Sequence, residues 1–182
     1  MSELFLGIDL GTSGLKLAAV SSDGAVVAEA EASYAVERPG PGRAEISPEK
    51  WEAALKIALA ELGDLRFAAV GIDGQMHGLV LVDGQGNPCR PAMLWPDRRA
   101  EAELAAWRDL TPDQRLRLAN PLTAGMAGPM LKWVQNHEPD VLSRATAALQ
   151  PKDYLRTRLG GPIVAERSDA SATLLWDVPG DG

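Results

Sequence analysis

The order of apolar segments near the N-terminus constrains the fold of this chain more than any other feature. Residues 4 to 8 (LFLGI) are continuous enough for a buried strand, and residues 15 to 20 (LKLAAV) predict a second one. The turn Asp23-Gly24 joins that segment to a third, residues 25 to 32. Three strands joined by tight turns predict two successive hairpins, and therefore an antiparallel start to a sheet.

A helix and a further strand follow these hairpins. Ser47 and Pro48 suit an N-cap and a first helical position, and apolar side chains then recur at helical spacing until Gly63 ends the run. Residues 66 to 73 (RFAAVGID) are apolar enough to predict a central strand covered on both faces. The resulting β-β-β-α-β order indicates an α/β domain with a mixed sheet and helices.

Beyond these segments the pattern is mostly helical. Thr111 and Gln114 fit a capping box, in which a hydroxyl and an amide satisfy two free backbone N–H groups. There is no internal repeat and no low-complexity tract. The later predicted elements are two short strands within residues 79 to 95, helices at 97 to 109, from 111 onward and at 129 to 137, a strand at 146 to 150 and a helix at 151 to 159.

Composition excludes several classes of protein. The 182 residues carry a formal net charge of −7 and no basic run interleaved with aromatic residues, so no nucleic-acid partner is expected. Cys89 is the single cysteine, which excludes an intrachain disulfide and a cysteine-built zinc site and suits a reducing compartment. Asp9 interrupts the N-terminal apolar stretch too early for a signal peptide or a membrane span. We expect a soluble cytoplasmic protein without a membrane partner.

The sequence GIDLGTSGLK places a glycine-rich turn between the first two predicted strands. Backbone N–H groups of Gly11, Thr12 and Ser13 can line an anion-binding nest, because glycine permits the backbone angles that nests need. Asp9 would repel a bare phosphate, so its presence favours a Mg²⁺ ion between the two, bound directly or through water. The spacing is neither a Walker loop nor a dinucleotide-binding motif. A second interpretation is a hairpin whose glycines serve only to turn the chain.

In this order of elements, the turn resembles the first phosphate loop of the actin, chaperone ATPase and sugar-kinase superfamily, whose core is ribonuclease-H-like. Residues 69 to 99 resemble the FGGY carbohydrate kinases, and GQMHG at 74 to 78 resembles xylulokinases in particular. PKDYLRTRLGG at 151 to 161 and SDASATLLWD at 168 to 177 are also similar to that family. The resemblance implies that residues 1 to 182 form an N-terminal FGGY kinase domain.

The resemblance implies sugar-binding roles for four residues. Met76 and His77 match positions that contact the ketose, where imidazole can exchange hydrogen bonds with a hydroxyl and methionine offers an adaptable apolar wall. Trp95 and Asp97 match a cluster near the sugar, where an indole stacks on the C–H surface and a carboxylate binds hydroxyls. Without the resemblance, His77 is an ordinary loop residue, Trp95 a core residue and Asp97 the N-cap of the next helix.

Other polar positions are predicted to be structural. The motif Lys-Asp-Tyr at 152 to 154 belongs to the family pattern but is expected mainly to pack and cap a helix. Cys89 and His137 show no partner pattern. Met130 is a departure, because relatives commonly carry a lysine there, and a polar contact through that lysine is not expected in this chain.

The implied activity is ATP-dependent phosphorylation of a ketopentose, with D-xylulose converted to D-xylulose 5-phosphate and Mg²⁺ assisting in-line transfer. The chain would supply the sugar-side half, since its motifs include neither the aspartate general base nor the second, nucleotide-binding domain. A positioned base contributes about 10²–10⁴-fold, and alignment in a closed cleft about 7–11 kcal/mol, so the chain alone is expected to be nearly inert. The alternative hypothesis is a noncatalytic sugar-sensing or partner-binding domain derived from such a kinase.

The same resemblance predicts how the surface behaves. A face that packs on a second domain in the family should stay partly apolar here, and exposed apolar patches favour self-association. We therefore expect a dimer or an aggregation-prone species.

Overall fold

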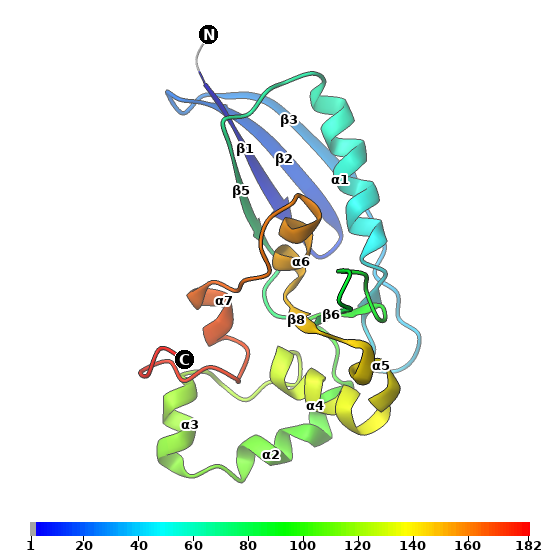
Figure 1. Cartoon of the computed structure of the whole chain (residues 1–182), viewed down its shortest axis with the longest axis vertical. Helices are drawn as coiled ribbons and strands as arrows, with labels where there is room; N and C mark the ends of the chain where they lie inside the picture. Colours follow the sequence, from blue (N-terminus) through cyan, green and yellow to red (C-terminus); the bar gives the residue numbers. More distant parts are fainter. Residues whose placement is uncertain (1–2) are drawn as a thin grey trace.

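A four-stranded sheet covered by one long helix forms the upper part of the molecule in the computed structural model, which describes residues 3 to 182 (Figure 1). We call these elements the sheet part. The strand order is β3-β2-β1-β5, so the predicted β-β-β-α-β order is confirmed for this sheet. The elements are β1 (Leu4–Leu10), β2 (Gly14–Ser21), β3 (Val26–Ser33), α1 (Glu49–Leu62) and β5 (Ala69–Gly74).

The sheet is mixed, as its pairing shows. β1 pairs antiparallel with β2, and β2 with β3, which confirms the two predicted hairpins, while β5 runs parallel to β1. Leu6, Ile8 and Leu10 of β1 are buried in the core that also contains Trp51 of α1, whereas Asp9 is exposed on the opposite face. Side chains alternate between faces along a strand, so β1 presents one apolar face to α1 and one open face to solvent.

The prediction that residues 66 to 73 form a central strand covered on both faces is wrong. Within the described residues the only strand beside β5 is β1, so β5 is an edge strand, and its Val70 is 50% exposed. Ala69 and Gly71 are exposed as well. Alanine and glycine lack polar side chains wherever they lie, so the segment has an apolar composition without being buried.

The two ends of α1 differ in how well they were predicted. The prediction that the Ser47 side chain caps the helix is wrong, because its hydroxyl donates to the Glu49 carboxylate and α1 begins without a side-chain cap. Gly63 ends the helix as predicted, with a φ of 71° that glycine adopts without a Cβ penalty.

Short strands and helices form the lower part of the molecule, which we call the helical part. The two strands predicted within residues 79 to 95 form β6 and β7, which do not pair with each other as a ladder. A single isolated bridge, Leu79–Met93, joins their segments, because β6 pairs with β8 and β7 with β4. The elements of the helical part are β4 (Glu45–Ile46), β6 (Val80–Val82), β7 (Ala92–Met93), the 3-10 helix η1 (Arg99–Leu104), α2 (Ala105–Arg108), α3 (Pro112–Leu118), α4 (Ala127–His137), α5 (Pro139–Arg144) and β8 (Ala147–Leu149).

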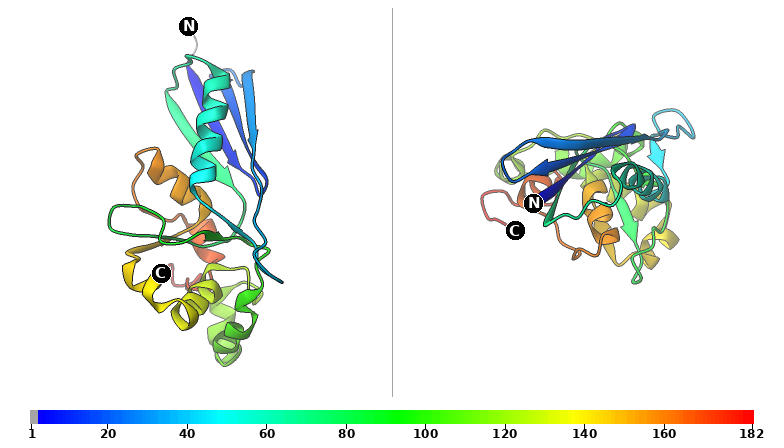
Figure 2. Two further views of the ribbon diagram at one scale, coloured as in Figure 1. Left: turned by 90° about the vertical axis from the view of Figure 1, so that its right-hand side faces the viewer. Right: turned by 90° about the horizontal axis from the view of Figure 1, so that it is seen from above.

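Two further helices, α6 (Pro151–Arg158) and α7 (Arg167–Ser171), lie between the sheet part and the helices of the lower part (Figure 2). α6 contacts β5 and α1. The capping box at the start of α3 is confirmed: Gln114 N–H donates to Thr111 Oγ1 at 3.2 Å, and Thr111 N–H donates to Gln114 Oε1 at 2.9 Å. Among the helices of residues 3 to 182, none has both the length and the apolar character needed to cross a membrane.

Large apolar side chains remain exposed on the sheet part, among them Phe5, Val26, Val27 and Val70. Exposed apolar groups of this kind support association with another surface. The self-association expected from the sequence stays a prediction.

Candidate active site

The glycine-rich turn between β1 and β2 is held through its backbone. Gly11 N–H donates to the Gly14 carbonyl at 2.9 Å, and a Cβ at position 11 would lie only 2.9 Å from that carbonyl oxygen. The Tyr34 hydroxyl contacts the carbonyl oxygens of Gly11 at 2.6 Å and of Gly14 at 3.0 Å. Gln75, the residue after β5, donates from Nε2 to the Gly11 carbonyl at 3.4 Å. Glycine is therefore required at position 11, and neighbouring strands brace the turn on two sides.

A hollow of about 260 Å³ opens at this turn. Its lining includes Gly11, Thr12 and Ser13, the residues predicted to bind phosphate, together with Asp9, the residue predicted to orient the metal. Burial, and secondarily the charge of Asp9, raise the pKa of Tyr34, so its hydroxyl keeps its proton and remains a donor to the turn. The structure thus brings the predicted phosphate-side residues together. Of the three predicted N–H donors, that of Gly11 is bonded to the Gly14 carbonyl and is not available to an anion, which leaves those of Thr12 and Ser13.

Four charged residues form a row across the open face of the sheet beside the turn. Asp73, Asp9, Lys16 and Glu31 are successive Cα neighbours on β5, β1, β2 and β3. Mg²⁺ is usually held by one or two carboxylates together with phosphate oxygens and water. Asp9 and Lys16 line the hollow at the turn, whereas Asp73 lies beside Asp9 on the adjacent strand and lines a different hollow. Asp9 with its neighbour Asp73 for a metal, and Lys16 as a cation for a phosphate, fit a metal-bound phosphate.

Asp73 was missed by sequence reasoning, although the sequence carries a signal for it. The triplet Gly-Ile-Asp lies one residue before the end of both β1, at residues 7 to 9, and β5, at residues 71 to 73. In a parallel pair such repeats place equivalent side chains side by side. Within the described residues there is no group of three or more His, Cys, Asp or Glu side chains that could hold a metal alone. Phosphate oxygens and water would complete the coordination.

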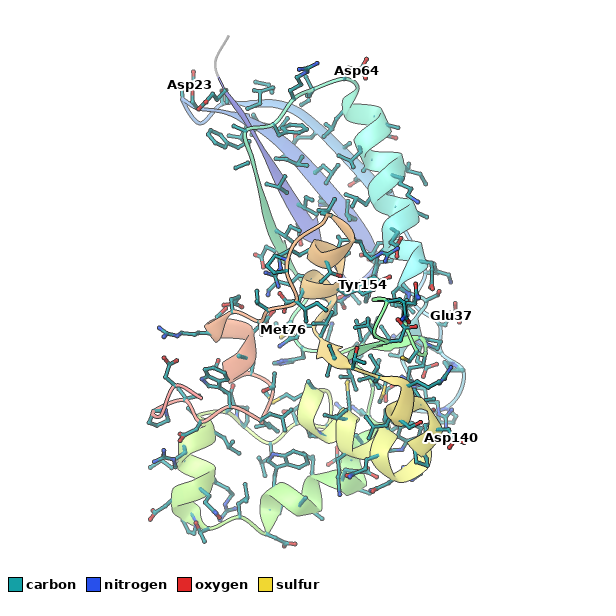
Figure 3. All side chains as sticks on the ribbon, viewed as in Figure 1. Asp23, Glu37, Asp64, Met76, Asp140 and Tyr154 are labelled. Atoms are coloured by element: carbon teal, nitrogen blue, oxygen red, sulfur yellow. The ribbon has the colours of Figure 1, made fainter. Side chains whose placement is uncertain are left out.

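The segment that follows β5 carries the residues predicted to contact the sugar. His77 has a φ of 59° and Gly78 a φ of 90°, so the chain turns sharply here. A Cβ at position 78 would lie 3.0 Å from the Met93 carbonyl oxygen, which requires glycine. Met76 is 61% exposed and lies between the lower end of the sheet and the helical part (Figure 3).

His77 is partly buried, and this determines its charge. Burial lowers the pKa of His77 below 6.5, while the charge of Asp169 and the backbone of Ala172 oppose the shift. The imidazole is therefore neutral at pH 7. Within the described residues its buried Nδ1 atom has no hydrogen-bond partner. A neutral imidazole can both donate to and accept from a sugar hydroxyl.

Trp95, one of the residues predicted to contact the sugar, reaches the glycine-rich turn. Its Nε1–H donates to Thr12 Oγ1 at 3.2 Å, across a large separation in sequence, and the side chain is 45% exposed. Its main chain packs against residue 125, where a Cβ would lie 2.1 Å from the Trp95 carbonyl oxygen. Gly125 is therefore the residue type that lets the two segments approach.

Asp97 lies in a different environment from Met76, His77 and Trp95. It is 1% exposed, and its carboxylate accepts from Ala44 N–H at 2.7 Å, Arg99 Nη2 at 2.7 Å and Arg99 N–H at 2.9 Å. These contacts are all within the protein and hold the turn that follows Trp95. The role of Asp97 as a direct ligand of the sugar stays a prediction, and the geometry favours the structural interpretation.

The Lys-Asp-Tyr motif makes structural contacts. Lys152 Nζ lies 3.0 Å from Asp153 and 2.8 Å from Asp169, and the buried Tyr154 donates its hydroxyl to Glu52 at 2.5 Å. The charge of Asp169, a residue of α7, also acts on the pKa of His77, so α7 lies near the segment that carries His77. The ion pair between Lys152 and Asp169 therefore holds α7 beside that segment. Sequence reasoning missed this arrangement, because it depends on how two distant segments dock.

The chain matches the model of the N-terminal domain of the FGGY family of carbohydrate kinases over residues 4–180. This chain belongs to the FGGY family of carbohydrate kinases. Over 179 residues the FGGY domain is 40% identical to the xylulose kinase of Escherichia coli strain K12, a match that covers 96% of the chain and 37% of that relative. A xylulose kinase from Staphylococcus epidermidis is 38% identical, with 97% of the chain and 36% of the relative covered.

Solved structures agree with this assignment. A xyloylose kinase from Brucella ovis superimposes on the FGGY domain with a TM-score of 0.90 and 35% identity, over 96% of this chain and 37% of that one. The xylulose kinase from Rhodospirillum rubrum gives a TM-score of 0.91 and 27% identity, over 98% and 39%. The predicted fold, that of the actin, chaperone ATPase and sugar-kinase superfamily, is confirmed. The FGGY domain spans little more than a third of the length of these relatives.

Proposed function

We propose that this FGGY domain binds a ketopentose and the phosphate end of ATP in an enzyme that converts D-xylulose to D-xylulose 5-phosphate. The observation that carries the proposal is the direct contact between the phosphate turn and the sugar-side residues, through Trp95 to Thr12 and through Gln75 to Gly11. A phosphoryl donor and its acceptor must lie within reacting distance, so their two sites must adjoin. Identity to xylulose kinases supports the choice of sugar.

Different residues of the domain would bind the phosphate, the metal and the sugar. Bound ATP with Mg²⁺ would supply the phosphoryl group and neutralise the charge on its oxygens. The backbone N–H groups of Thr12 and Ser13 would donate to phosphate oxygens, and Asp9 with Asp73 would hold the metal. Neutral His77 would bind a sugar hydroxyl, the exposed thioether of Met76 would form an apolar wall, and the ring of Trp95 would stack on the sugar.

The transfer step also needs a proton acceptor. The attacking hydroxyl oxygen forms a bond to the γ-phosphorus, the bond from that phosphorus to the ADP oxygen breaks, and the hydroxyl proton passes to a base. We place this base, an aspartate in the family, in the portion of the relatives that the present match does not cover. Without it the domain should transfer phosphate at least about 10²–10⁴-fold more slowly.

Calorimetric titration of the domain with D-xylulose tests the sugar-side assignment. We expect saturable binding that His77→Ala abolishes, because the substitution removes the imidazole from the sugar-side segment. His137→Ala is the matched control: His137 is the other histidine of the chain and stacks on Trp133 at a ring distance of 4.7 Å. Absence of binding to the unsubstituted domain, or binding unaffected by His77→Ala, would contradict the assignment.

A second experiment tests transfer itself. The domain is mixed with the separately produced C-terminal portion of the Escherichia coli xylulose kinase, and D-xylulose 5-phosphate is measured in the presence of ATP and Mg²⁺. Product that depends on both parts supports the kinase. Tight binding of D-xylulose without product in any mixture would instead favour the noncatalytic sugar-sensing role.

A further inference from the structure

We propose that Trp95 is a positioning residue for phosphate binding, because its indole N–H orients the hydroxyl of Thr12 toward the hollow at the turn. The proposal rests on the proposed function for the identity of the two ligands. It adds a direct physical link between the sugar side and the phosphate side of the site, carried by one side-chain hydrogen bond.

The chemistry of the two groups sets the direction of this hydrogen bond. An indole N–H can only donate, whereas a threonine hydroxyl has one hydrogen and two lone pairs. In the contact of 3.2 Å, Thr12 Oγ1 must therefore accept from Trp95, and its own hydrogen points elsewhere. Within residues 3 to 182 that hydroxyl donates to no protein atom, and Thr12 lines the hollow of about 260 Å³. The hydrogen is thus available to a phosphate oxygen.

Trp95 is held in place independently of the turn. The Asp97 N–H donates to the Leu94 carbonyl at 2.9 Å, which closes the main chain around Trp95. The Asp97 carboxylate pairs with Arg99 at 2.7 Å, and the two side chains are buried. The close approach of Gly125 to the Trp95 carbonyl fixes the other side. The main chain that carries the indole is therefore held by contacts other than the one to Thr12.

The turn is braced mainly through its main chain. Tyr34 and Gln75 contact its carbonyl oxygens, whereas the Thr12 hydroxyl contacts Trp95. Loss of the indole N–H would leave the main chain in place but free the hydroxyl to rotate among its staggered positions. A phosphate ligand would then have to order that hydroxyl when it binds.

A sugar on Trp95 would act through the same hydrogen bond. Its stacking on the exposed ring would exclude water from the contact with Thr12, and hydrogen bonds strengthen in a lower dielectric. Sugar and phosphate should therefore bind cooperatively, each raising the affinity of the other by the same factor. A single hydrogen bond of this kind corresponds to an effect of about 2- to 12-fold.

The experiment uses variants that remove either end of the hydrogen bond. Trp95→Phe keeps an aromatic face without the N–H, Thr12→Val keeps the shape without the hydroxyl, and Thr12→Ser restores the hydroxyl. Trp107→Phe is the matched control, because its Nε1–H makes a comparable bond of 2.8 Å to the Leu174 carbonyl. In the mixed transfer assay we expect Trp95→Phe and Thr12→Val each to lower kcat about 2- to 12-fold. The KM for D-xylulose at saturating ATP should rise by no more than the same factor, because both substitutions remove the coupling between the two ligands.

Two outcomes separate the inference from the proposed function. Because Thr12→Val already removes the contact that Trp95→Phe removes, the double variant should be no slower than Thr12→Val alone, Thr12→Ser should be active, and Trp107→Phe should match the unsubstituted domain. Effects that multiply in the double variant, or unchanged kcat in the single ones, would overturn the inference while the kinase stands. No transfer by any mixture would count against the proposed function instead.

If no mixture transfers phosphate, a measurement on the domain alone still tests the hydrogen bond between Trp95 and Thr12. The indole N–H signal of Trp95, assigned by its loss in Trp95→Phe, is followed by nuclear magnetic resonance. We expect Thr12→Val to shift this signal and speed its exchange with water, and Thr12→Ser to leave both nearly unchanged. Addition of inorganic phosphate should shift the signal in the unsubstituted domain but not in Thr12→Val. A Trp95 signal insensitive to Thr12→Val would overturn the inference.

Discussion

The sheet part and the helical part hold their halves of the candidate site by different means. The phosphate turn lies on strands paired with their neighbours in sequence, above an apolar core. Trp95 lies on a turn that buried charged groups from separate segments hold in place. Arg99 pairs with Asp97 and with Glu45, both at 2.7 Å, and Arg90 pairs with Glu45 and Glu138. The phosphate half should therefore depend on apolar packing, and the sugar half on an intact set of ion pairs.

Asp97→Ala should cause the largest loss of stability among the substitutions that test this difference. It leaves the buried Arg99 guanidinium and the Ala44 N–H without an acceptor, and breaking a buried ion pair costs about 3–5 kcal/mol of unfolding free energy. Urea unfolding measures this loss. The affinity for D-xylulose should fall as well, because the turn that carries Trp95 loosens.

The control for Asp97→Ala is a pair on the surface. Glu101 lies 3.3 Å from Arg108, and both side chains are more than half exposed. Glu101→Ala should change the unfolding free energy by less than about 1 kcal/mol. If Asp97→Ala were as mild as this control, the helical part would not depend on its buried ion pairs and the comparison would fail.

Leu55→Ala tests the sheet part in the same way. Leu55 of α1 is buried against the sheet, and truncation of a buried leucine costs about 2–5 kcal/mol. The affinity for D-xylulose measured below the unfolding transition should stay unchanged. Ile57→Ala on the exposed side of the same helix is the control and should be nearly neutral. An equal loss of stability and sugar affinity in Leu55→Ala would show that the two parts do not respond separately.

The same difference explains how much of the fold could be predicted from the sequence. The two hairpins, the body of α1 and the capping box at Thr111 depend on residues close together in the chain, and patterns predict them correctly. The edge position of β5 and the pairing of β6 with β8 depend on segments far apart. No local pattern contains that information, and the alanine and glycine content of β5 was misleading.

The candidate site follows the same rule. Asp9 and the turn residues lie within one hairpin, so their spacing alone predicts that they line a common hollow. The burial of Asp97 could not be predicted, because its partner Ala44 is brought in by another segment. Met130, the departure from the family pattern, belongs to α4 and is fully buried in the apolar core on which that helix packs, where a methionine side chain fits. The sequence alone could not predict these apolar surroundings of Met130, because distant segments form them.

A smaller effect is expected from pH on the sugar half. Burial lowers the pKa of His77, against the opposing Asp169 charge, so the folded domain resists protonation below pH 6.5, where the unfolded chain takes up a proton. Stability contributed by neutral His77 is thus fully present above that pH and is lost as pH falls through the lower folded pKa. The affinity for D-xylulose should be flat from about pH 8 to 6.5 and then fall by roughly tenfold, because the cation cannot accept a hydrogen bond.

Asp169→Asn sharpens this test. Removal of the carboxylate should lower the pKa of His77 further, because that charge favours the protonated ring. The midpoint of the affinity loss should therefore move to lower pH in Asp169→Asn and stay in place in His137→Ala. Lys152, which pairs with Asp169, should remain charged throughout this range and so leaves the direction unchanged. A midpoint above pH 6.5 in the unsubstituted domain would show that burial does not control His77.

The smallest effect is expected where the helical part relies on a local contact. Thr111→Ala removes the side chain that accepts from Gln114 N–H at the start of α3, and loss of such a cap costs about 1 kcal/mol. Thr111→Ser should retain most of the stability, since the hydroxyl remains. Hydrogen exchange of the Gln114 amide should report the change directly, while the affinity for D-xylulose should not move, because the cap is not part of the ion pairs that hold Trp95. If Thr111→Ala also lowered the affinity for D-xylulose, the position of Trp95 would depend on α3 as well. The buried ion pairs alone would then not account for how the sugar half is held.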